Sequence, residues 1–511
     1  MTRTKRIMIQ GVASAVGKSL ITAGLCRIFR QDGFKVAPFK SQNMALNSFI
    51  TADGLEMGRA QVVQAEAAGL PPDVRMNPVL LKPTTDRNAQ VIVGGKVYGN
   101  MSAVEYHEFK PQLAGLVKEH YDALAAANEI VVIEGAGSPA EINLRDKDIV
   151  NMGMAELADA PVLLVGDIDR GGVFAALAGT MLLLTESERE RVQGVIINKF
   201  RGDRSILQPG IVMLEEIVKR PVLGVVPYLK LNIEDEDSLT ERFTRQQSQT
   251  AGVDIAVVKL PRLSNFTDFN VLENLEDVSL RYVETAASLG EPDLIILPGT
   301  KNTLEDLAYL RRSGLENAMI RQHRRGAIIA GICGGFQMLG KTIADPYRME
   351  SELAQSTGMG LLNIDTVLER EKRTVQITGK LLHDQGLFAG LGGLVLTGYE
   401  IHLGVTTCHE GTVPLIELEQ PFGNENNGVN GGVCNVQGSV FGSYLHGLFD
   451  NVRFTAGLIN NIRSRKGLDP LAGTPTDYRS FKESQYDLLA EQLRQNLDLG
   501  RIYRIMENWG S

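Results

Sequence analysis

The stretch GVASAVGKS (11–19) separates the apolar run RIMIQ (6–10) from the helical pattern LITAGLCRIFRQ (20–31). A strand, a glycine-rich turn and a helix in this order are typical of a phosphate-binding loop, in which backbone N–H groups at the helix N-terminus hold phosphate oxygens. The loop is one residue longer than the usual pattern, because five residues separate its two glycines. We therefore predict a P-loop that binds ATP. Its expected nucleotide-binding residues are Gly11, Gly17, Lys18 and Ser19.

Each polar group near this loop has an expected role. Lys18 is predicted to reach the β and γ phosphates of ATP, and the Ser19 hydroxyl is predicted to bind Mg²⁺. Glu134 and Asp167 each end an apolar run that we predict to be a strand, so both are expected at the sheet edge where the metal would bind. Weaker candidates are Glu141 and Asp169 for the metal, and the strand-end pair Asn198 and Lys199 for a purine base.

Two series of β-rich apolar runs alternate with helical stretches, which is the pattern of parallel sheets with crossover helices. The first series is RIMIQ (6–10), FKVAPF (34–39), EIVVIE (129–134), APVLLVGD (160–167), VQGVIINK (192–199) and PVLGVVP (221–227). The second is DIAVVKL (254–260), SLRYVE (279–284), DLIILPG (293–299), GAIIAGIC (326–333), GYEIHLG (398–404) and SVFGSYLHG (439–447). We predict an α/β protein with two parallel-sheet domains, over 1–227 and 252–450. A polar linker over 228–251 would join them, and a helical extension would occupy 451–511.

Composition excludes several classes of protein. The 511 residues carry 52 Lys and Arg against 61 Asp and Glu, a formal charge of −9, which disfavours a general binder of nucleic acid or of anionic membranes. No apolar run approaches the 18 residues of a membrane span. The four cysteines form no CxxC pair, which argues against a disulfide framework and a structural zinc site. We expect a cytoplasmic protein and leave its oligomeric state open.

A cysteine in the second half has the setting of a nucleophile. In AIIAGICGGFQML (327–339), Cys333 falls between a β-rich run and a helical run, with small glycine neighbours. The positive end of the following helix lowers the pKa of a thiol and favours the reactive thiolate. The N–H of Gly334 is a natural oxyanion donor, and Gly299, in the turn PGT (298–300), is the expected second donor.

A thiolate nucleophile needs a base, and we choose His446 among the seven histidines because it ends the apolar run FGSYLHG (441–447). The rival is His402, which is at an alternating strand position and is as well explained by packing in the core. Position 448, two residues after the chosen histidine, is a leucine rather than an acid. Glu400 is the substitute we consider for orienting the imidazole, so the third member of a triad stays open.

These motifs together resemble the cobyric acid synthase family. GICGGFQMLG (331–340) and SYLHG (443–447) are similar to class I glutamine amidotransferases, and the long P-loop is similar to dethiobiotin synthetase. The resemblance extends over nearly the whole chain. Further stretches that carry it are FKSQNMALNS (39–48), GRAQVVQAEAAG (58–69), NPVLLKP (77–83), EGAGSPAEINL (134–144) and LPGTKNT (297–303).

The resemblance implies an ATP- and glutamine-dependent ligase of cobalamin biosynthesis. Such an enzyme amidates the b, d, e and g carboxylates of adenosylcobyrinic acid a,c-diamide, with its nucleophile and histidine at Cys333 and His446. The corrinoid substrate carries several carboxylates and carboxamides, which amide and ammonium side chains of the protein are suited to bind. Candidates for binding it are Lys40, Gln42, Asn43 and Asn47. Two alternatives stay open: a cobyrinic acid a,c-diamide synthase, and a P-loop switch protein with an inactive amidotransferase domain.

Overall fold

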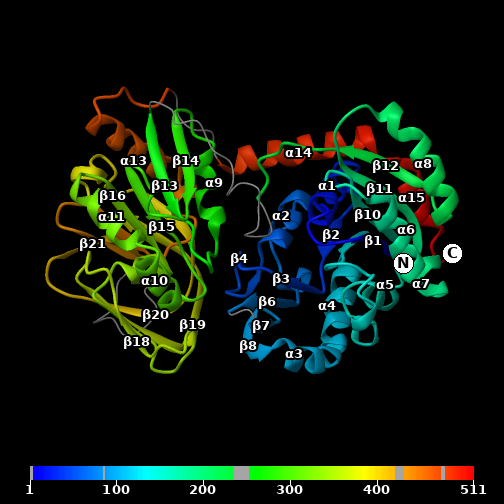
Figure 1. The fold of residues 1–511 in the computed structure, drawn as a ribbon, viewed down its shortest axis with the longest axis horizontal. Helices are drawn as coiled ribbons and strands as arrows, with labels where there is room; N and C mark the ends of the chain where they lie inside the picture. The colour runs from blue at the N-terminus through cyan, green and yellow to red at the C-terminus, as the bar shows by residue number, and fades with distance from the viewer. Residues whose placement is uncertain (1–3, 85–86, 235–251, 420–430, 473–477, 511) are drawn as a thin grey trace.

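Two α/β domains lie side by side in the computed structural model (Figure 1). The structure describes residues 4–84, 87–234, 252–419, 431–472 and 478–510. The first domain is built on a parallel sheet in the order β12-β11-β10-β1-β9-β2. These strands are β1 (Lys5–Gly11), β2 (Val36–Phe39), β9 (Ile130–Glu134), β10 (Val162–Asp167), β11 (Val192–Phe200) and β12 (Val222–Pro227). They coincide with the first predicted series.

Helices cover both faces of this sheet, so every residue of β9 and β10 is buried, and both strands are apolar up to the acid that ends each of them. The helices of this domain are α1 (Lys18–Gln31), α2 (Arg59–Ala68), α3 (Ala103–Phe109), α4 (Ala114–Ala127), α5 (Met152–Leu157), α6 (Val173–Leu183), α7 (Glu186–Arg191) and α8 (Arg204–Val218). In the register of β1 and β9, Ile9 pairs with Glu134, so the P-loop and this carboxylate emerge at the same sheet edge.

A smaller sheet follows β2, and no apolar run predicted it. Its order is β3-β6-β7-β8, and a separate hairpin joins β4 to β5. The bounds are β3 (Gln42–Met44), β4 (Ser48–Ile50), β5 (Glu56–Gly58), β6 (Val79–Pro83), β7 (Asn88–Val93) and β8 (Lys96–Ser102). The strands are short and partly polar, so the period-2 pattern that identifies strands is weak in them.

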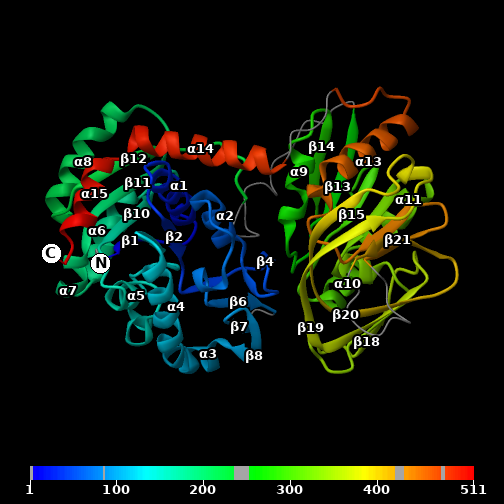
Figure 2. The same ribbon diagram turned by 180° about the vertical axis from the view of Figure 1, so that it is seen from behind.

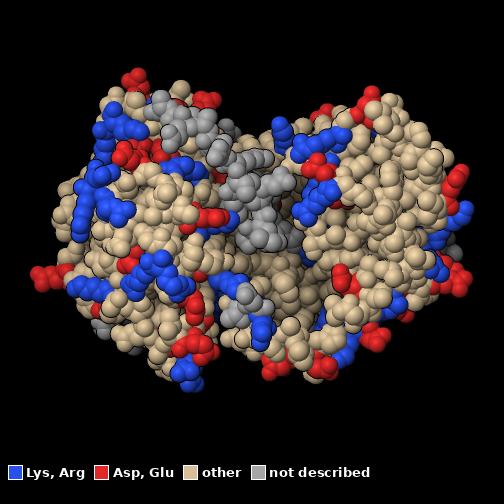
Figure 3. All heavy atoms as spheres, viewed as in Figure 1, with Lys and Arg blue, Asp and Glu red and all other residues tan. Residues whose placement is uncertain are grey.

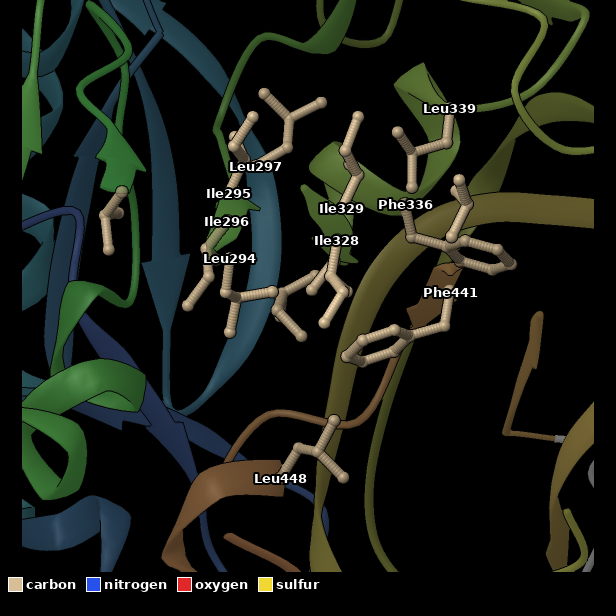
Figure 4. Packing of buried hydrophobic residues seen from close by; sticks show 14 of the residues in the cluster. Leu294, Ile295, Ile296, Leu297, Ile328, Ile329, Phe336, Leu339, Phe441 and Leu448 are labelled. Atoms are coloured by element: carbon tan, nitrogen blue, oxygen red, sulfur yellow. The ribbon is translucent and has the colours of Figure 1, made fainter. Parts of the chain in front are cut away.

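The second domain has a mixed sheet whose parallel part has the order β14-β13-β15-β16-β23. These strands are β13 (Val253–Val258), β14 (Val278–Val283), β15 (Leu294–Leu297), β16 (Ile328–Ile332) and β23 (Val440–Ser443). Figure 4 shows Leu294, Ile295, Ile328 and Ile329 of this sheet near Phe441 of β23 in one core. The helices are α9 (Asn270–Glu273), α10 (Thr303–Arg312), α11 (Leu315–Arg324) and α12 (Gly334–Met338).

The sheet continues beyond β23 with mainly antiparallel strands, an addition to the parallel domain that we predicted. These are β17 (Thr342–Ala344), β18 (Gln355–Thr357), β19 (Ile364–Leu381), β20 (Val395–Cys408), β21 (Thr412–Leu418) and β22 (Gly432–Asn435). The predicted run 398–404 falls inside β20, which pairs along its length with β19. This long pair reaches the first domain and forms the domain contact.

The C-terminal helices divide between the domains instead of forming one extension. α13 (Val452–Arg465) packs in the core of the second domain through Phe454 and Leu458. α14 (Tyr478–Asn496) and α15 (Leu499–Asn508) return to the first domain, where Leu489 and Leu493 pack with α1. Both ribbon views show α14 crossing above α2 and α1 (Figures 1 and 2). The chain therefore passes between the domains twice.

The hairpin of β4 and β5 docks the first domain onto the second. The hydroxyl of Tyr399 in β20 donates to the carbonyl of Ser48 at 3.1 Å, and the N–H of Ser48 donates to Asn265 at 3.1 Å. Ile50 is fully buried against Tyr399. Of the predicted linker, 235–251 lie outside the described residues.

The surface carries charges of both signs. On the face drawn in Figure 3, Lys and Arg lie among Asp and Glu over both domains. Among the described residues, no helix is both long and apolar enough to cross a bilayer.

Candidate active sites

Cys333 lies at the turn between β16 and α12, at the N-terminal end of that helix. Its φ of 51° is in the left-handed region, which a residue with a side chain adopts only when its surroundings enforce it. The neighbours have to be small, because a Cβ on Gly335 would lie 1.9 Å from the carbonyl oxygen of Leu297. The residue is 8% exposed and lines a cavity. GICGG therefore forms the sharp turn that presents a nucleophile.

His446 follows β23 and is 1% exposed. Its Nδ1 lies 2.7 Å from Oδ2 of Asp268, whose other oxygen accepts a hydrogen bond from the N–H of Gly447 at 3.1 Å. Burial lowers the pKa of His446, but the charge and hydrogen bond of Asp268, together with Cys333, outweigh it and raise the pKa to about 10. The ring is therefore an imidazolium at neutral pH.

Cys333 and His446 line the same cavity, and Cys333 is close enough to contribute to the raised pKa of the histidine. Asp268 occupies Nδ1, which leaves Nε2 as the nitrogen for proton exchange. Tyr399 stacks on the imidazole with ring centroids 5.3 Å apart and fixes its plane. A thiol, an imidazole and an orienting carboxylate form the arrangement that generates a cysteine nucleophile.

The carboxylate that orients the histidine is Asp268, not Glu400, the substitute that we considered from the sequence. Glu400 pairs with Arg373 at 2.6 Å, and the nearest histidine nitrogen is Nε2 of His402, at 3.6 Å. His402 lines the cavity, but its ring stacks on Tyr444 at 3.7 Å and its Nδ1 lies 2.8 Å from the carbonyl of Gly404. These contacts favour packing for His402.

The predicted oxyanion donors lie beside this site. A Cβ on Gly299 would be 3.4 Å from Cε1 of His446, and a Cβ on Gly334 would be 2.8 Å from Cγ2 of Thr300. The PGT turn and the cysteine turn therefore pack against each other on one side of the cavity. Their N–H groups as oxyanion donors remain a prediction.

The P-loop lies between β1 and α1, as predicted. Gly17 has a φ of 97°, and a Cβ there would lie 2.1 Å from Nδ2 of Asn198, so only glycine fits. Lys18 is 6% exposed and its Nζ donates to the carbonyls of Ala13 and Gly137, each at 2.9 Å. These contacts hold the lysine side chain over the loop, where its ammonium group can contact bound phosphates.

Glu134 is the centre of a buried polar cluster beside the P-loop. Its Oε1 accepts from the Ser19 hydroxyl at 2.7 Å and from Nζ of Lys40 at 2.9 Å, and its Oε2 accepts from Gln64 at 2.5 Å. A hydroxyl and a carboxylate side by side are hard oxygen donors of the kind that Mg²⁺ prefers. Across the described part of the chain, no three His, Cys, Asp or Glu side chains converge on one point.

Asp167 has a different environment from the metal site that we predicted. Its carboxylate pairs with Lys199 at 3.0 Å, and Lys199 also donates to the carbonyl of Ala15 in the P-loop at 2.8 Å. Asn198 donates to the carbonyl of Val16 at 2.8 Å. Asn198 and Lys199 therefore hold the P-loop through two of its backbone carbonyls. The carboxylate of Asp167 neutralises the charge of Lys199. The weaker candidate Asp169 pairs with Arg201 at 2.8 Å.

A cavity of about 860 Å³ opens beside the P-loop. That volume is near the upper end of the ~300–1,000 Å³ typical of small-molecule sites. Its walls include the following predicted residues: Gly17, Lys18, Ser19, Lys40, Gln42, Asn43, Glu141 and Asn198. Asn47 is not among them; it is 1% exposed, and its Oδ1 accepts from the N–H of Phe266 at 3.2 Å. The prediction that it binds the corrinoid is therefore corrected to a role in domain docking.

Comparison with known proteins finds a family model for each domain. Residues 7–239 match the CobQ/CobB/MinD/ParA nucleotide binding domain, and residues 254–454 match the CobB/CobQ-like glutamine amidotransferase domain. A protein of Alkaliphilus metalliredigens named cobyric acid synthase is 53% identical over 98% of this chain and 99% of its own length. The chain belongs to the cobyric acid synthase family. Another member of the family, from Caldanaerobacter subterraneus, is 55% identical over 99% of both chains.

Two further members of the family agree in length as well. The protein of Clostridium tetani is 54% identical over 99% of this chain, and that of Streptococcus sanguinis is 55% identical over 98%. Each match covers at least 99% of the relative. The similarity to these relatives therefore extends over both the nucleotide-binding half and the amidotransferase half of this chain.

Proposed function

We propose that this chain is a cobyric acid synthase, which uses ATP and glutamine to amidate the b, d, e and g carboxylates of adenosylcobyrinic acid a,c-diamide to give adenosylcobyric acid. The observation that carries the proposal is the presence, in one chain, of a cysteine–histidine–aspartate site and a P-loop cavity. One site releases nitrogen from a carboxamide and the other activates an acid. Relatives with this name match nearly the full length of the chain.

The second domain carries out the glutamine half of the reaction. The Cys333 thiolate attacks the glutamine carboxamide, and Gly299 and Gly334 stabilise the oxyanion through their N–H groups. The His446 imidazolium gives its Nε2 proton to the departing ammonia, since Asp268 holds the other nitrogen. Water then hydrolyses the thioester to glutamate. The raised pKa of the histidine suits it to act as the acid of the first step.

The first domain makes the carboxylate reactive. A carboxylate is a poor electrophile, so transfer of the γ-phosphoryl group from ATP would give an acyl phosphate that ammonia attacks, with release of phosphate. Gly11 and Gly17 allow the loop amides to approach the phosphates, and Lys18 neutralises charge on the transferring group. We keep Asn198 as a nucleotide-site residue because it supports the loop from behind.

Ser19 and Glu134 are the residues that would hold Mg²⁺, and Asp167, which pairs with Lys199, stays the proposed third one. Bound there, the ion would neutralise charge on the phosphates. Lys40 pairs with the same Glu134 oxygen, so ion binding there would compete with this pairing. Lys40, Gln42 and Asn43 line the cavity and are proposed to contact the carboxylates and carboxamides of the corrinoid.

Ammonia that escapes into neutral water becomes mostly ammonium, which is not nucleophilic. We therefore propose a sheltered path between the two sites, kept closed by the domain contact at the hairpin of β4 and β5.

The catalytic units are 4–234 with α14 and α15, and 252–472. A cytoplasmic location suits the free thiol of Cys333, which an oxidising compartment would endanger.

Mass spectrometry of the corrinoid product tests this function against its alternatives. Four added amides are expected; two, at a and c, would identify the diamide synthase. A P-loop switch protein would show no release of glutamate that depends on Cys333, so a glutaminase assay with Cys333→Ala as control would detect that class.

A further inference from the structure

The cavity beside Cys333 is lined by three lysines, one from the first domain and two from the second. They are Lys82 of β6, Lys301 after β15 and Lys372 of β19, and Glu350 is the one acid among the lining residues that the structure describes. The cavity is narrow, about 30 Å³, so a substrate enters only if long side chains at its walls move aside. The chemistry at Cys333 needs none of these ammonium groups, so they require another explanation.

Two of the three lysines already have an anionic partner. Nζ of Lys82 lies 2.8 Å from Oε1 of Glu56, and Nζ of Lys372 lies 2.6 Å from Oε2 of the same carboxylate. Lys82 also donates to the Ser48 hydroxyl at 2.8 Å. This cluster closes the cavity from the side of the first domain, and both of its ammonium groups share one carboxylate partner within the protein.

Lys301 differs from the other two. It is 5% exposed, and within the ranges that the structure describes no hydrogen bond or ion pair reaches its Nζ. Burial lowers its pKa, while the negative charge of Glu350 opposes the shift. An ammonium that is buried without a hydrogen-bonded partner is unfavourable, so this position is suited to an anion that arrives with a ligand.

Glu350 offers the complementary charge. Its Oε2 accepts from the N–H of Thr303 at 3.2 Å and lies 3.1 Å from the hydroxyl of the same residue. That hydroxyl also lies 3.2 Å from Oε1 of Gln337, which follows Cys333 on α12. The carboxylate is thus fixed by α10 and connected to the cysteine helix, while its other oxygen has no hydrogen bond to the described residues.

Free glutamine carries one charge that is complementary to each of these two side chains. When its carboxamide meets Cys333, its other end brings one carboxylate and one ammonium into the same cavity. We propose that Lys301 binds the α-carboxylate of glutamine and Glu350 its α-ammonium, so that the site selects the free amino acid over side-chain amides in peptides. This inference rests on the proposed function, because it takes the carboxamide at Cys333 as the reacting group.

Three substrates separate a binding role from a structural one. L-Glutamine has both charges, its α-methyl ester lacks the carboxylate charge, and 4-carbamoylbutanoate lacks the ammonium. In Lys301→Met, KM for glutamine should rise about ten- to hundred-fold, the size expected for one charged hydrogen bond. KM for the ester should change little, because the ester has no anion to lose. Glu350→Gln should raise KM for glutamine and leave KM for 4-carbamoylbutanoate nearly unchanged.

Lys380→Met is the matched control, since Lys380 is an exposed lysine of β19 in the same domain. It should keep wild-type KM values for all three substrates. A KM for glutamine within threefold of wild type in Lys301→Met would overturn the proposal. An equal loss toward glutamine and the ester would also overturn it, because that result indicates a general structural effect. Wild-type protein that releases no ammonia from glutamine would instead refute the proposed function itself.

Discussion

Exchanging Asp268 for asparagine tests the triad directly. The exchange retains the shape of the side chain, and an amide oxygen can still accept from the N–H of Gly447, which now lies 3.1 Å from Oδ1. What disappears is the negative charge 2.7 Å from Nδ1 of His446. We therefore expect the fold to persist and the protonation of the imidazole to change.

The expected magnitude follows from burial. Removing one partner of a buried, hydrogen-bonded charge pair costs about 3–5 kcal/mol. If the whole loss raises the activation free energy, the rate falls by about 10² to 10⁴. The same exchange in a serine protease triad costs about 10⁴ in kcat, at the upper end of this interval.

The pH profile should change as well. His446 has a raised pKa, so its imidazolium persists as pH rises until about 10 and is lost above that value. Without Asp268, burial still lowers the pKa of the ring and only Cys333 still raises it, so the pKa falls below that of the wild type. The alkaline limb of glutaminase activity should therefore move to lower pH in the variant.

A glutaminase assay at several pH values, run beside amidation with added ammonia, measures both effects. Asp268→Asn should lose glutaminase activity by at least a hundredfold. Glu400→Gln is the control, because that carboxylate pairs with Arg373 and should contribute far less. Glutaminase activity within tenfold of wild type in Asp268→Asn, with an unmoved alkaline limb, would refute the triad.

Three further predictions concern other parts of the molecule. Cys333→Ala should abolish glutamine-dependent amidation and spare turnover with ammonia; loss of both activities would contradict separable sites. Lys18→Ala should reduce amidation from either nitrogen source by about 10² or more, and normal turnover with ammonia would reject its phosphate role. Burial raises the pKa of Asp306 to about 7, so the folded state holds this proton more tightly and loses stability as pH rises from about 4 to 7. In Asp306→Asn, thermal unfolding should therefore shift less between pH 5 and pH 8 than in wild type; parallel shifts would argue against the buried acid.

The sequence predicted the parallel part of each sheet well, because central strands are buried on both faces and read as continuous apolar runs. β9 and β16 are examples, with every residue buried. The nucleophile turn was also predictable, because the close approach of Leu297 and Thr300 leaves room only for glycine at the two positions after Cys333. Burial on both faces and close packing around a turn each restrict the residue types in one short stretch, so each leaves a signal that the sequence shows.

Asp268 was missed because its partner is 178 residues away along the chain. A signal existed: the polar stretch SNFTDFN (264–270) follows β13, whose carboxyl end lies at the same sheet edge as the end of β23. Asp268 is far from His446 in sequence but lies beside it at this edge. Polar residues after parallel strands should be considered together, however distant they are in sequence.

Asn47 shows a second kind of error. Its segment is polar and has the composition of a ligand-binding loop, yet the amide meets a backbone N–H of the other domain. Nothing in the residue type distinguishes a buried polar partner across a domain contact from a substrate. The return of α14 to the first domain was unpredictable for a related reason, since an amphipathic helix indicates a buried face but not which domain covers it.

The central claim is that one site releases nitrogen which the other site uses. It is tested most directly by mass spectrometry of the corrinoid formed from amide-¹⁵N glutamine in the presence of unlabelled ammonium. Wild-type protein should give a product with four new amides that carry mostly ¹⁵N, and Cys333→Ala should give the same product without label. Dilution of the label to the level of the bulk ammonium, or label that persists in Cys333→Ala, would contradict the account.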